Sequence, residues 1–394
     1  MKKLLLATAA AALTAGTAGA EEVKLGLLIG FTGPIESLAP AMAAASELAA
    51  KEVSDSGKLL DGSTITMVRA DSTCTDAAVA QAAGEKLVTG DGVKGIVGAD
   101  CSGVTGAVLS NVAVPNGIVM VSPSATSPAL STAEDNGLFF RTAPSDAREG
   151  EVAADIMIER GIKTAALTYT NNDYGKGLAE AIAASFTAKG GVITIQAAHE
   201  DGKADYSAEV GALAAAGGDI LIVAGYLDQG GAGIIQAALD TGAFSTFQLP
   251  GGMIGTSMDE RFGPALNGSF GQIAGSDSAG AATFQEMAKA AGFDGVSAYS
   301  PESYDATALI ALAMQAAGST DPAAYAAKIM DVANAPGEKI MPGELAKGLE
   351  LVAAGTDVDF EGATAVELIG PGQRAGRDRE SEVKDGVQST VGFR

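Results

Sequence analysis

From residue 23 onward, short runs of apolar and β-branched residues alternate with longer Ala-rich stretches in which apolar positions recur every three or four residues. The short runs have the length and composition of buried strands, and the longer stretches have the spacing of amphipathic helices. Strands are expected at 23–31, 64–70, 93–99, 118–122, 164–169, 192–197, 219–225 and 246–249. Helices are expected at 38–53, 77–88, 146–160, 178–189 and 207–216. The alternation predicts an α/β fold of parallel sheets that helices cover on both faces.

The rhythm is interrupted at residues 139–146, where the sequence reads FFRTAPSD. Pro144 should end a strand there, and Ser145 or Asp146 can cap the helix that follows. After residue 275 the chain returns to helices, at 301–317 and 321–332, before a mixed, Gly-rich tail. We therefore predict two doubly wound parallel-sheet lobes joined by a hinge, with the chain crossing between them more than once.

The predicted domain boundaries place residues 21–143 and 275–365 in lobe 1, and residues 144–274 and 366–394 in lobe 2. Ligands of doubly wound sheets bind beyond the carboxyl ends of the strands. Two lobes that face each other at these ends enclose a cleft, which is where we expect a small ligand.

The first twenty residues have the pattern of a cleaved signal peptide. Lys2 and Lys3 form a basic start, residues 4–13 are apolar, and Ala18-Gly19-Ala20 is a small-x-small cleavage site before Glu21. A transmembrane helix needs about 18 strongly apolar residues, and this stretch is shorter and diluted by Thr and Gly. We expect residues 1–20 to be removed on export. The residue directly after the cleavage site is Glu21 and not a cysteine that could carry a lipid.

The charge balance excludes several partners. The chain has 25 Lys and Arg against 48 Asp and Glu, a formal charge of −23, which repels phosphate backbones and anionic lipid. We expect no nucleic-acid partner and a monomeric protein. The only histidine, His199, lies in a polar sequence and is expected in a solvated loop, so we expect no metal site, cofactor or imidazole-based catalysis.

The two cysteines, Cys74 and Cys101, favour a disulfide in an exported chain. A metal pair or a catalytic thiol is the alternative, and neither has a nearby histidine or a second cysteine pair. Residues 90–95 match GxGxxG, but they follow a predicted helix and precede a strand. A dinucleotide site needs the opposite order, so these glycines indicate a helix end and a turn.

Two loops rich in hydroxyl side chains follow neighbouring predicted strands. Residues 101–105 (CSGVT) open a helix after one strand, and residues 122–128 (SPSATSP) follow the next. Backbone N–H groups at a helix start, together with the Ser102 hydroxyl, suit an anion such as a carboxylate. Helix capping alone is the alternative explanation for these residues.

At these loops the sequence resembles the periplasmic solute-binding proteins of ABC importers, in the branched-chain amino-acid (leucine-binding) class with the type I periplasmic binding protein fold. The similarity covers essentially the whole mature chain, and its segments agree in order and spacing. They are residues 23–34, 71–76 around Cys74, 98–102 around Cys101, 122–128, 172–177, 205–207, 225–226 and 304–306. The resemblance implies a periplasmic location, a Cys74–Cys101 disulfide and a hinge that closes two lobes on a ligand before the protein docks on a membrane permease.

Residue by residue, the resemblance implies a ligand site. Ser102 and Thr126, with the backbone at Ser124, match the positions that hold the ligand's carboxylate. Tyr174 and Tyr226 match residues of the second lobe that close over the ligand, and Tyr299 matches an aromatic residue of the side-chain pocket. Structural packing is the alternative role for each tyrosine.

The sequence departs from leucine-type binders at two places. Leucine-type binders have a Glu in a Gly-Pro-Glu-Gly turn that receives the ligand's ammonium. Residues 249–252 of this chain are LPGG, with Gly251 at the position of the Glu. Leaving an ammonium unpaired costs about 2–5 kcal/mol, so another acid replaces the Glu or the ligand lacks the ammonium. Asp228, Asp305 and Glu36 are candidate replacements. Leu38 stands where these binders carry an aromatic residue, which changes the pocket shape.

The expected function is the solute-binding component of an ABC importer that captures a small carboxylate, such as a branched-chain or hydrophobic amino acid or a related compound. The first alternative is a sensor that delivers the ligand to a receptor kinase or chemoreceptor, and the second is uptake of a non-amino-acid acid or amide. An exported α/β hydrolase is disfavoured, because no nucleophile and base are paired by any motif.

Overall fold

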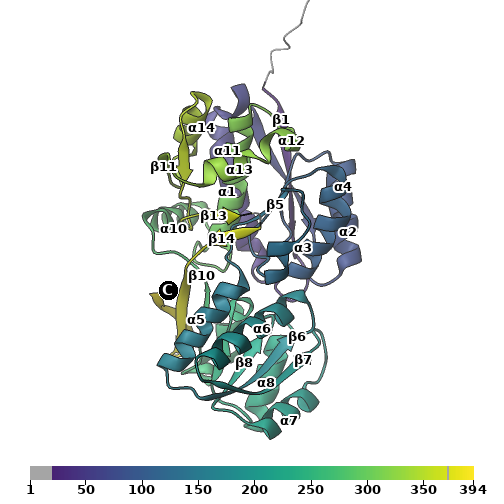
Figure 1. Ribbon diagram of the computed structural model, residues 1–394, viewed down its shortest axis with the longest axis vertical. Helices are drawn as coiled ribbons and strands as arrows, with labels where there is room; N and C mark the ends of the chain where they lie inside the picture. Colours follow the sequence, from purple (N-terminus) through teal and green to yellow (C-terminus); the bar gives the residue numbers. More distant parts are fainter. Residues whose placement is uncertain (1–19, 371) are drawn as a thin grey trace, which may run out of the picture.

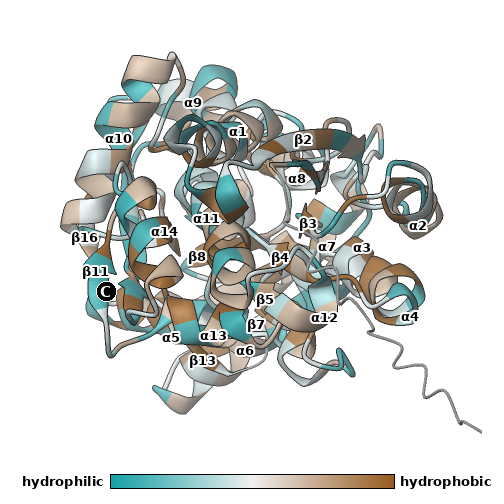
Figure 2. Cartoon of the chain, turned by 90° about the horizontal axis from the view of Figure 1, so that it is seen from above, coloured by the Kyte–Doolittle hydropathy of each residue, from teal (hydrophilic) through white to brown (hydrophobic). Residues whose placement is uncertain are grey.

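Two large sheets organise the computed structural model, which describes residues 20–370 and 372–394. The first sheet is parallel, with the order β2-β1-β3-β4-β5. Its strands are β1 (Glu22–Ile29), β2 (Thr64–Asp71), β3 (Ile96–Gly98), β4 (Met120–Ser122) and β5 (Phe139–Arg141). The side chains of β3, β4 and β5 are buried along their whole length, and β4 and β5 carry apolar colour in the view from above (Figure 2).

The second sheet has the order β16-β15-β10-β9-β8-β6-β7. A parallel set contains β6 (Thr164–Thr170), β7 (Val192–His199), β8 (Ile220–Ala224), β9 (Phe247–Leu249) and β10 (Phe270–Ala274). Two strands from much later in the chain, β15 (Asp378–Lys384) and β16 (Val387–Phe393), extend it in antiparallel orientation at the β10 edge. The predicted α/β architecture with two lobes is confirmed, and this sheet is mixed rather than purely parallel.

Helices cover both sheets (Figure 1). In the first lobe, α1 (Ala39–Ser56) packs along the buried helix α11 (Ser300–Ala317), while α2 (Ala77–Glu85) packs on α3 (Ser102–Val108). In the second lobe, α5 (Asp146–Glu159) packs on α6 (Asp173–Ala188), and α7 (Ser207–Ala216) packs on α8 (Gly230–Thr241). The remaining helices are α4 (Val114–Asn116), α9 (Thr256–Phe262), α10 (Ala279–Ala291), α12 (Pro322–Tyr325), α13 (Lys328–Ala333) and α14 (Leu345–Ala353).

The chain passes between the two sheets after β5, after β10 and before β15. Two small ribbons belong to the C-terminal third: β11 (Glu338–Ile340) pairs with β12 (Val358–Phe360), and β13 (Glu367–Gly370) pairs with β14 (Gln373–Ala375). The crossings agree with a chain that visits each lobe more than once. The residue boundaries of the lobes stay predictions.

Some elements differ from the expected ones for local reasons. The helix expected at 178–189 begins at Asp173, because the Asn172 side chain accepts a hydrogen bond from the Gly175 N–H at 3.0 Å and caps the helix there. The helix expected at 321–332 is two short helices, α12 and α13. Strand β10 and the C-terminal strands were not predicted, because their short, mixed sequences carry little periodicity.

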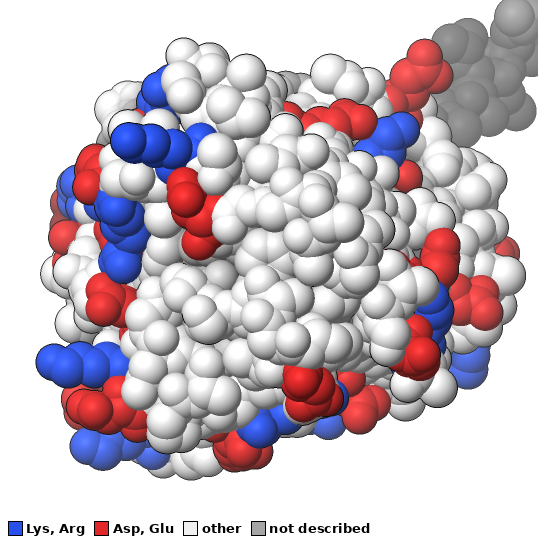
Figure 3. All heavy atoms as spheres, turned by 90° about the horizontal axis from the view of Figure 1, so that it is seen from below, with Lys and Arg blue, Asp and Glu red and all other residues white. Residues whose placement is uncertain are grey.

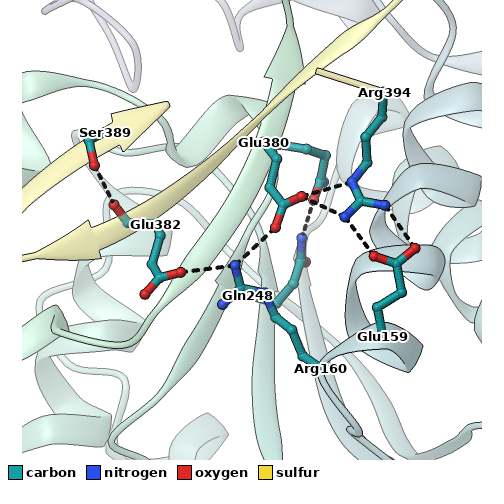
Figure 4. A network of polar contacts seen from close by, with 8 residues as sticks. Glu159, Arg160, Gln248, Glu380, Glu382, Ser389 and Arg394 are labelled. Carbon is teal, nitrogen blue, oxygen red and sulfur yellow. Dashed lines mark hydrogen bonds and ion pairs between the residues drawn. The ribbon is translucent and has the colours of Figure 1, made fainter. Parts of the chain in front are cut away.

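A cluster of ion pairs fastens the C-terminal strands to α5 (Figure 4). Arg394 lies within 2.8 Å of Glu159 and 2.7 Å of Glu380, and Glu380 also pairs with Arg160 at 2.9 Å. Because Glu380 is only 9% exposed and several charges share the cluster, these pairs fix the strand's position more firmly than an isolated surface pair would.

Cys74 and Cys101 form a disulfide, as predicted, with an S–S distance of 2.06 Å. The bond joins the segment after β2 to the residue before α3, and both sulfurs are buried. It therefore holds two loops together at the carboxyl edge of the first sheet.

Removing this bond should destabilise the protein. A bridge across a sequence separation of 27 residues restricts the unfolded chain, so Cys74→Ala with Cys101→Ala should lower the free energy of unfolding by about 3–4 kcal/mol. Urea unfolding measures this loss, and the wild type under reducing conditions should show a similar loss. Identical urea midpoints for the oxidised and reduced wild type would contradict the prediction.

Candidate functional site

Asp100 joins the ends of several strands at the carboxyl edge of the first sheet. Its Oδ2 accepts a hydrogen bond from the Gly30 N–H at 2.6 Å, and its Oδ1 accepts one from the Ser72 hydroxyl at 2.6 Å. The Asp100 carbonyl accepts a third bond from the Ser124 hydroxyl at 2.9 Å. Burial raises the pKa of this carboxyl group. Asp100 thus fixes the loops that carry the predicted hydroxyl side chains, although no motif in the sequence singles it out.

The three predicted hydroxyl residues lie near one another but are not equivalent. Ser102 begins α3, and its Oγ accepts a hydrogen bond from the Ser127 N–H at 3.1 Å. Ser124 is held by Asp100. Thr126 is buried in the same loop as Ser124, and its hydroxyl lies beside the Asp146 carboxyl group, whose pKa it lowers against the larger effect of burial.

Two predicted tyrosines approach from the second lobe. Tyr174 lies in the first turn of α6 and Tyr226 follows β8. Their rings stack with centroids 5.0 Å apart and planes inclined by 18°. The Tyr174 hydroxyl accepts a hydrogen bond from the Gly252 N–H at 2.9 Å. Burial raises the pKa of both phenols well above the ordinary value, so both stay neutral and can act as hydrogen-bond donors.

Tyr299 occupies an unusual backbone conformation directly before α11. Its φ of 60° and ψ of 7° are left-handed, a region that costs a non-glycine residue about 1–3 kcal/mol. Its carbonyl accepts hydrogen bonds from the Ser303 N–H at 3.0 Å and the Ser303 hydroxyl at 2.8 Å, which hold the strained turn in place. The ring is buried, with only 6% of the residue exposed, against the same cavity as the other tyrosines.

These residues surround a small cavity of about 20 Å³ between the lobes. Five of the six predicted site residues line it, namely Ser102, Ser124, Tyr174, Tyr226 and Tyr299. Thr126 is buried beside the same loop but is not among the lining residues. Ile35, Leu38, Asp100, Cys101 and Gly252 complete the lining. Of these, sequence reasoning missed Ile35, Asp100 and Gly252 as site residues.

The three acids suggested as replacements for the missing Glu do not line the cavity. Asp228 bridges the lobes at the rim, where its N–H donates to the Pro34 carbonyl at 3.1 Å and its carboxylate accepts from the Ser37 N–H at 2.9 Å. Asp305 is buried and accepts from the Ala363 and Thr364 N–H groups. Glu36 is exposed to solvent.

A different group of acids is buried beneath Gly251. The Gly251 N–H donates to Glu149 Oε1 at 2.8 Å, and the Gln272 side chain donates to the same oxygen at 3.0 Å. Burial, and then the neighbouring Asp146 and Asp378, raise the pKa of Glu149 well above its ordinary value. Burial also raises the pKa of Asp146 to about 7 and that of Asp378 to about 6.

The prediction of a solvated loop for His199 was wrong. His199 is the final residue of β7 and is 1% exposed, with Nδ1 2.9 Å from the Thr168 hydroxyl oxygen. Burial lowers its pKa to about 4, so the ring is neutral at physiological pH. The strand continues two residues past its expected end and carries the ring into the lobe.

Two α/β lobes that close on one cavity, each supplying part of its lining, define a solute-binding protein with a clamshell architecture. The chain belongs to the periplasmic binding protein family, whose model matches residues 22–346.

Similar proteins span nearly the whole chain. The "Leu/Ile/Val-binding protein homolog 3" of Brucella melitensis is 31% identical over 347 residues, covering 84% of this chain and 89% of that protein. A leucine-binding protein of Thermotoga maritima has a similar structure, with a TM-score of 0.78 at 19% identity over 94% of this chain and 98% of that one. A solute-binding protein of R. palustris in complex with benzoate has a TM-score of 0.75 at 22% identity, over 94% and 96%. These structures share the type I fold.

The predicted signal peptide, apart from Ala20, lies outside the described residues. Within the described part of the chain, every helix is too short or too polar to span a bilayer.

The buried acids should make stability depend on pH. The pKa of Asp146 is raised from 3.8 in the unfolded chain to about 7 in the folded protein. The contribution of Asp146 to the free energy of unfolding is therefore fully present below about pH 4, where the group is protonated in both states, and it is lost as the pH rises through 7. Asp146→Asn cannot ionise, so its stability relative to the wild type should rise by about 2–3 kcal/mol between pH 5 and pH 8.

Thermal unfolding of the ligand-free proteins at the two pH values checks this expectation. Asp155→Asn is the matched control, because Asp155 lies on the same helix but is exposed and pairs with Lys189. A difference between Asp146→Asn and the wild type that is the same at both pH values would contradict the assignment.

Proposed function

We propose that the protein is the extracytoplasmic solute-binding component of an ABC importer and delivers a small carboxylate ligand, of the hydrophobic amino-acid class, to a membrane permease. One observation carries the proposal: a small cavity lies between the lobes, with Ser102 and Ser124 on one wall and tyrosines on the other. Curated relatives named as Leu/Ile/Val-binding proteins support this ligand class.

Carboxylate binding would rest on local groups of the first lobe. Ser102 and Ser124 line the cavity, Thr126 lies in the same loop as Ser124, and backbone N–H groups at the start of α3 lie beside them. Hydrogen bonds to a charged acceptor are about twice as strong as neutral ones. They must overcome the long-range repulsion of a chain with a charge of −23.

The surface charge fits a protein that stays in solution between two binding events. On the face seen from below, acidic and basic side chains lie together around the edge and leave a broad uncharged centre (Figure 3). Mixed charge of this kind favours solubility and does not create a strong field at that face.

Closure would couple ligand capture to delivery. Tyr174 and Tyr226 belong to the second lobe, so a ligand held by the first lobe gains their contacts only when the lobes meet. The Asp228 contacts with Pro34 and Ser37 then join the lobes at the rim. A ligand that makes these contacts only in the closed form shifts the population toward it, and the closed form is the one we propose for permease docking.

Ligand binding should raise the melting temperature of the purified protein. We expect one or more of leucine, isoleucine, valine, 4-methylpentanoate and benzoate to stabilise it, by about 2.7 kcal/mol at a ligand concentration of 100 Kd. Ser102→Ala with Thr126→Ala should abolish this response, because it removes two hydroxyl donors, whereas the Ser124 hydroxyl already donates to the Asp100 carbonyl.

The matched control is Ser110→Ala with Thr132→Ala, which removes two exposed hydroxyls of the same lobe that lie outside the cavity. The control should respond as the wild type does. The proposal fails if no compound of the panel raises the wild-type melting temperature, and the site assignment fails if the Ser102 and Thr126 variant still responds.

A further inference from the structure

We infer that Glu149 replaces the acid that Gly251 lacks and receives the ammonium group of the ligand, which makes an α-amino acid the preferred ligand. The inference rests on the proposed function, because it assigns the second pole of the same cavity. Four features of the structure support it: the space at Gly251, the orientation of the Glu149 carboxyl group, its position behind the tyrosines, and the hydrogen bonds that already occupy both carboxylate oxygens of Asp100.

The space that a side chain at position 251 would enter is bounded by Tyr299, Ile273 and Glu149. A Cβ atom built on Gly251 would lie 2.8 Å from the Tyr299 hydroxyl oxygen and 3.4 Å from Glu149 Oε2. A carboxylate therefore already reaches the place from which an acid at position 251 would extend. In this chain the acid near this space is Glu149 of α5, and not a residue of the turn after β9.

Glu149 is held in a defined orientation. Both hydrogen bonds that it accepts from described residues, from the Gly251 N–H and from the Gln272 side chain, end on Oε1. Oε2 is the oxygen beside the Gly251 space. One oxygen is thus used for positioning, and the other remains available for a ligand donor.

The carboxyl group lies directly behind the cavity lining. Gly252, which adjoins Gly251, lines the cavity together with Tyr174 and Tyr299. After burial, the charge of Glu149 is the largest influence that raises the pKa values of these two tyrosines, as expected for close neighbours. Glu149 itself is not part of the cavity lining, so an ammonium at this end would approach it past Gly252 and Tyr299.

Asp100 is the one acid that lines the cavity itself, and it is already committed. Its two oxygens accept hydrogen bonds from Gly30 and Ser72. It also lies on the wall of Ser102 and Ser124, where a ligand carboxylate is expected. The cavity therefore has a donor-rich wall in the first lobe and an acid behind the opposite wall, and this arrangement fits a zwitterion better than a simple anion.

The test compares leucine with its des-amino analogue, 4-methylpentanoate. Calorimetric titration of the wild type should give an affinity for leucine at least about 30-fold higher than for 4-methylpentanoate. Glu149→Gln keeps the side-chain shape and an acceptor for Gly251 but cannot ionise to pair with a bound ammonium. It should lower leucine affinity by about 30-fold or more while changing 4-methylpentanoate affinity less than about threefold.

Glu302→Gln is the matched control, because Glu302 is a buried acid that does not lie beside Gly251, and it should leave the affinity ratio unchanged. Glu149→Asp, which retains the charge on a shorter side chain, should fall between the wild type and Glu149→Gln. It also serves as the second variant if Glu149→Gln does not fold.

Equal wild-type affinities for the two ligands would overturn this inference and leave the proposed function intact. Equal losses for both ligands in Glu149→Gln would also overturn it, because the carboxyl group would then act on the cavity as a whole. If the wild type bound neither these two ligands nor any other compound of the panel, the proposed function itself would fail.

Discussion

The cavity depends on the buried carboxyl group of Asp100. Loops beyond the ends of parallel strands are more mobile than the strands, so a ligand site built on them needs contacts that fix the loops. Asp100 accepts from the loop after β1 and from the loop after β2, and its carbonyl holds Ser124 after β4. The disulfide between Cys74 and Cys101 locks the neighbouring segment covalently. The donor-rich wall is therefore rigid before any ligand arrives, which lowers the entropy cost of binding.

The opposite wall is built by different means. Tyr174 is placed by the helix cap at Asn172, and Tyr299 by a strained left-handed turn that Ser303 holds. Behind them, Glu149, Asp146 and Asp378 share a poorly solvated region in which each carboxyl group raises the cost of ionising the next. This group of buried acids lowers the stability of the fold. It lies beside Gly251, the position at which leucine-type binders carry an acid.

Much of the fold could be predicted from the sequence, because strands such as β6 and β8 and helices such as α1 have strong and regular apolar patterns. The site hydroxyls could be found because loops such as residues 122–128 have a distinctive composition. Other features depend on tertiary contacts that no local pattern encodes. In the sequence Glu149 looks like an ordinary helix residue. Only the folded structure brings Gly251, after β9, and Gln272, in β10, into hydrogen-bond contact with it. His199 was misplaced because its polar neighbours conceal a strand that continues into the core.

The antiparallel strands at the edge of the second sheet bear on the order of folding. β10 is complete in the chain long before β15, because all of α10 to β14 lies between them and packs mainly with the first lobe. Until the C-terminal strands reach the second sheet, the β10 edge therefore has no strand partner on that side. An open edge of this kind can pair with other chains, so pairing of β15 with β10 covers this edge, and β16 becomes the outer strand of the folded sheet.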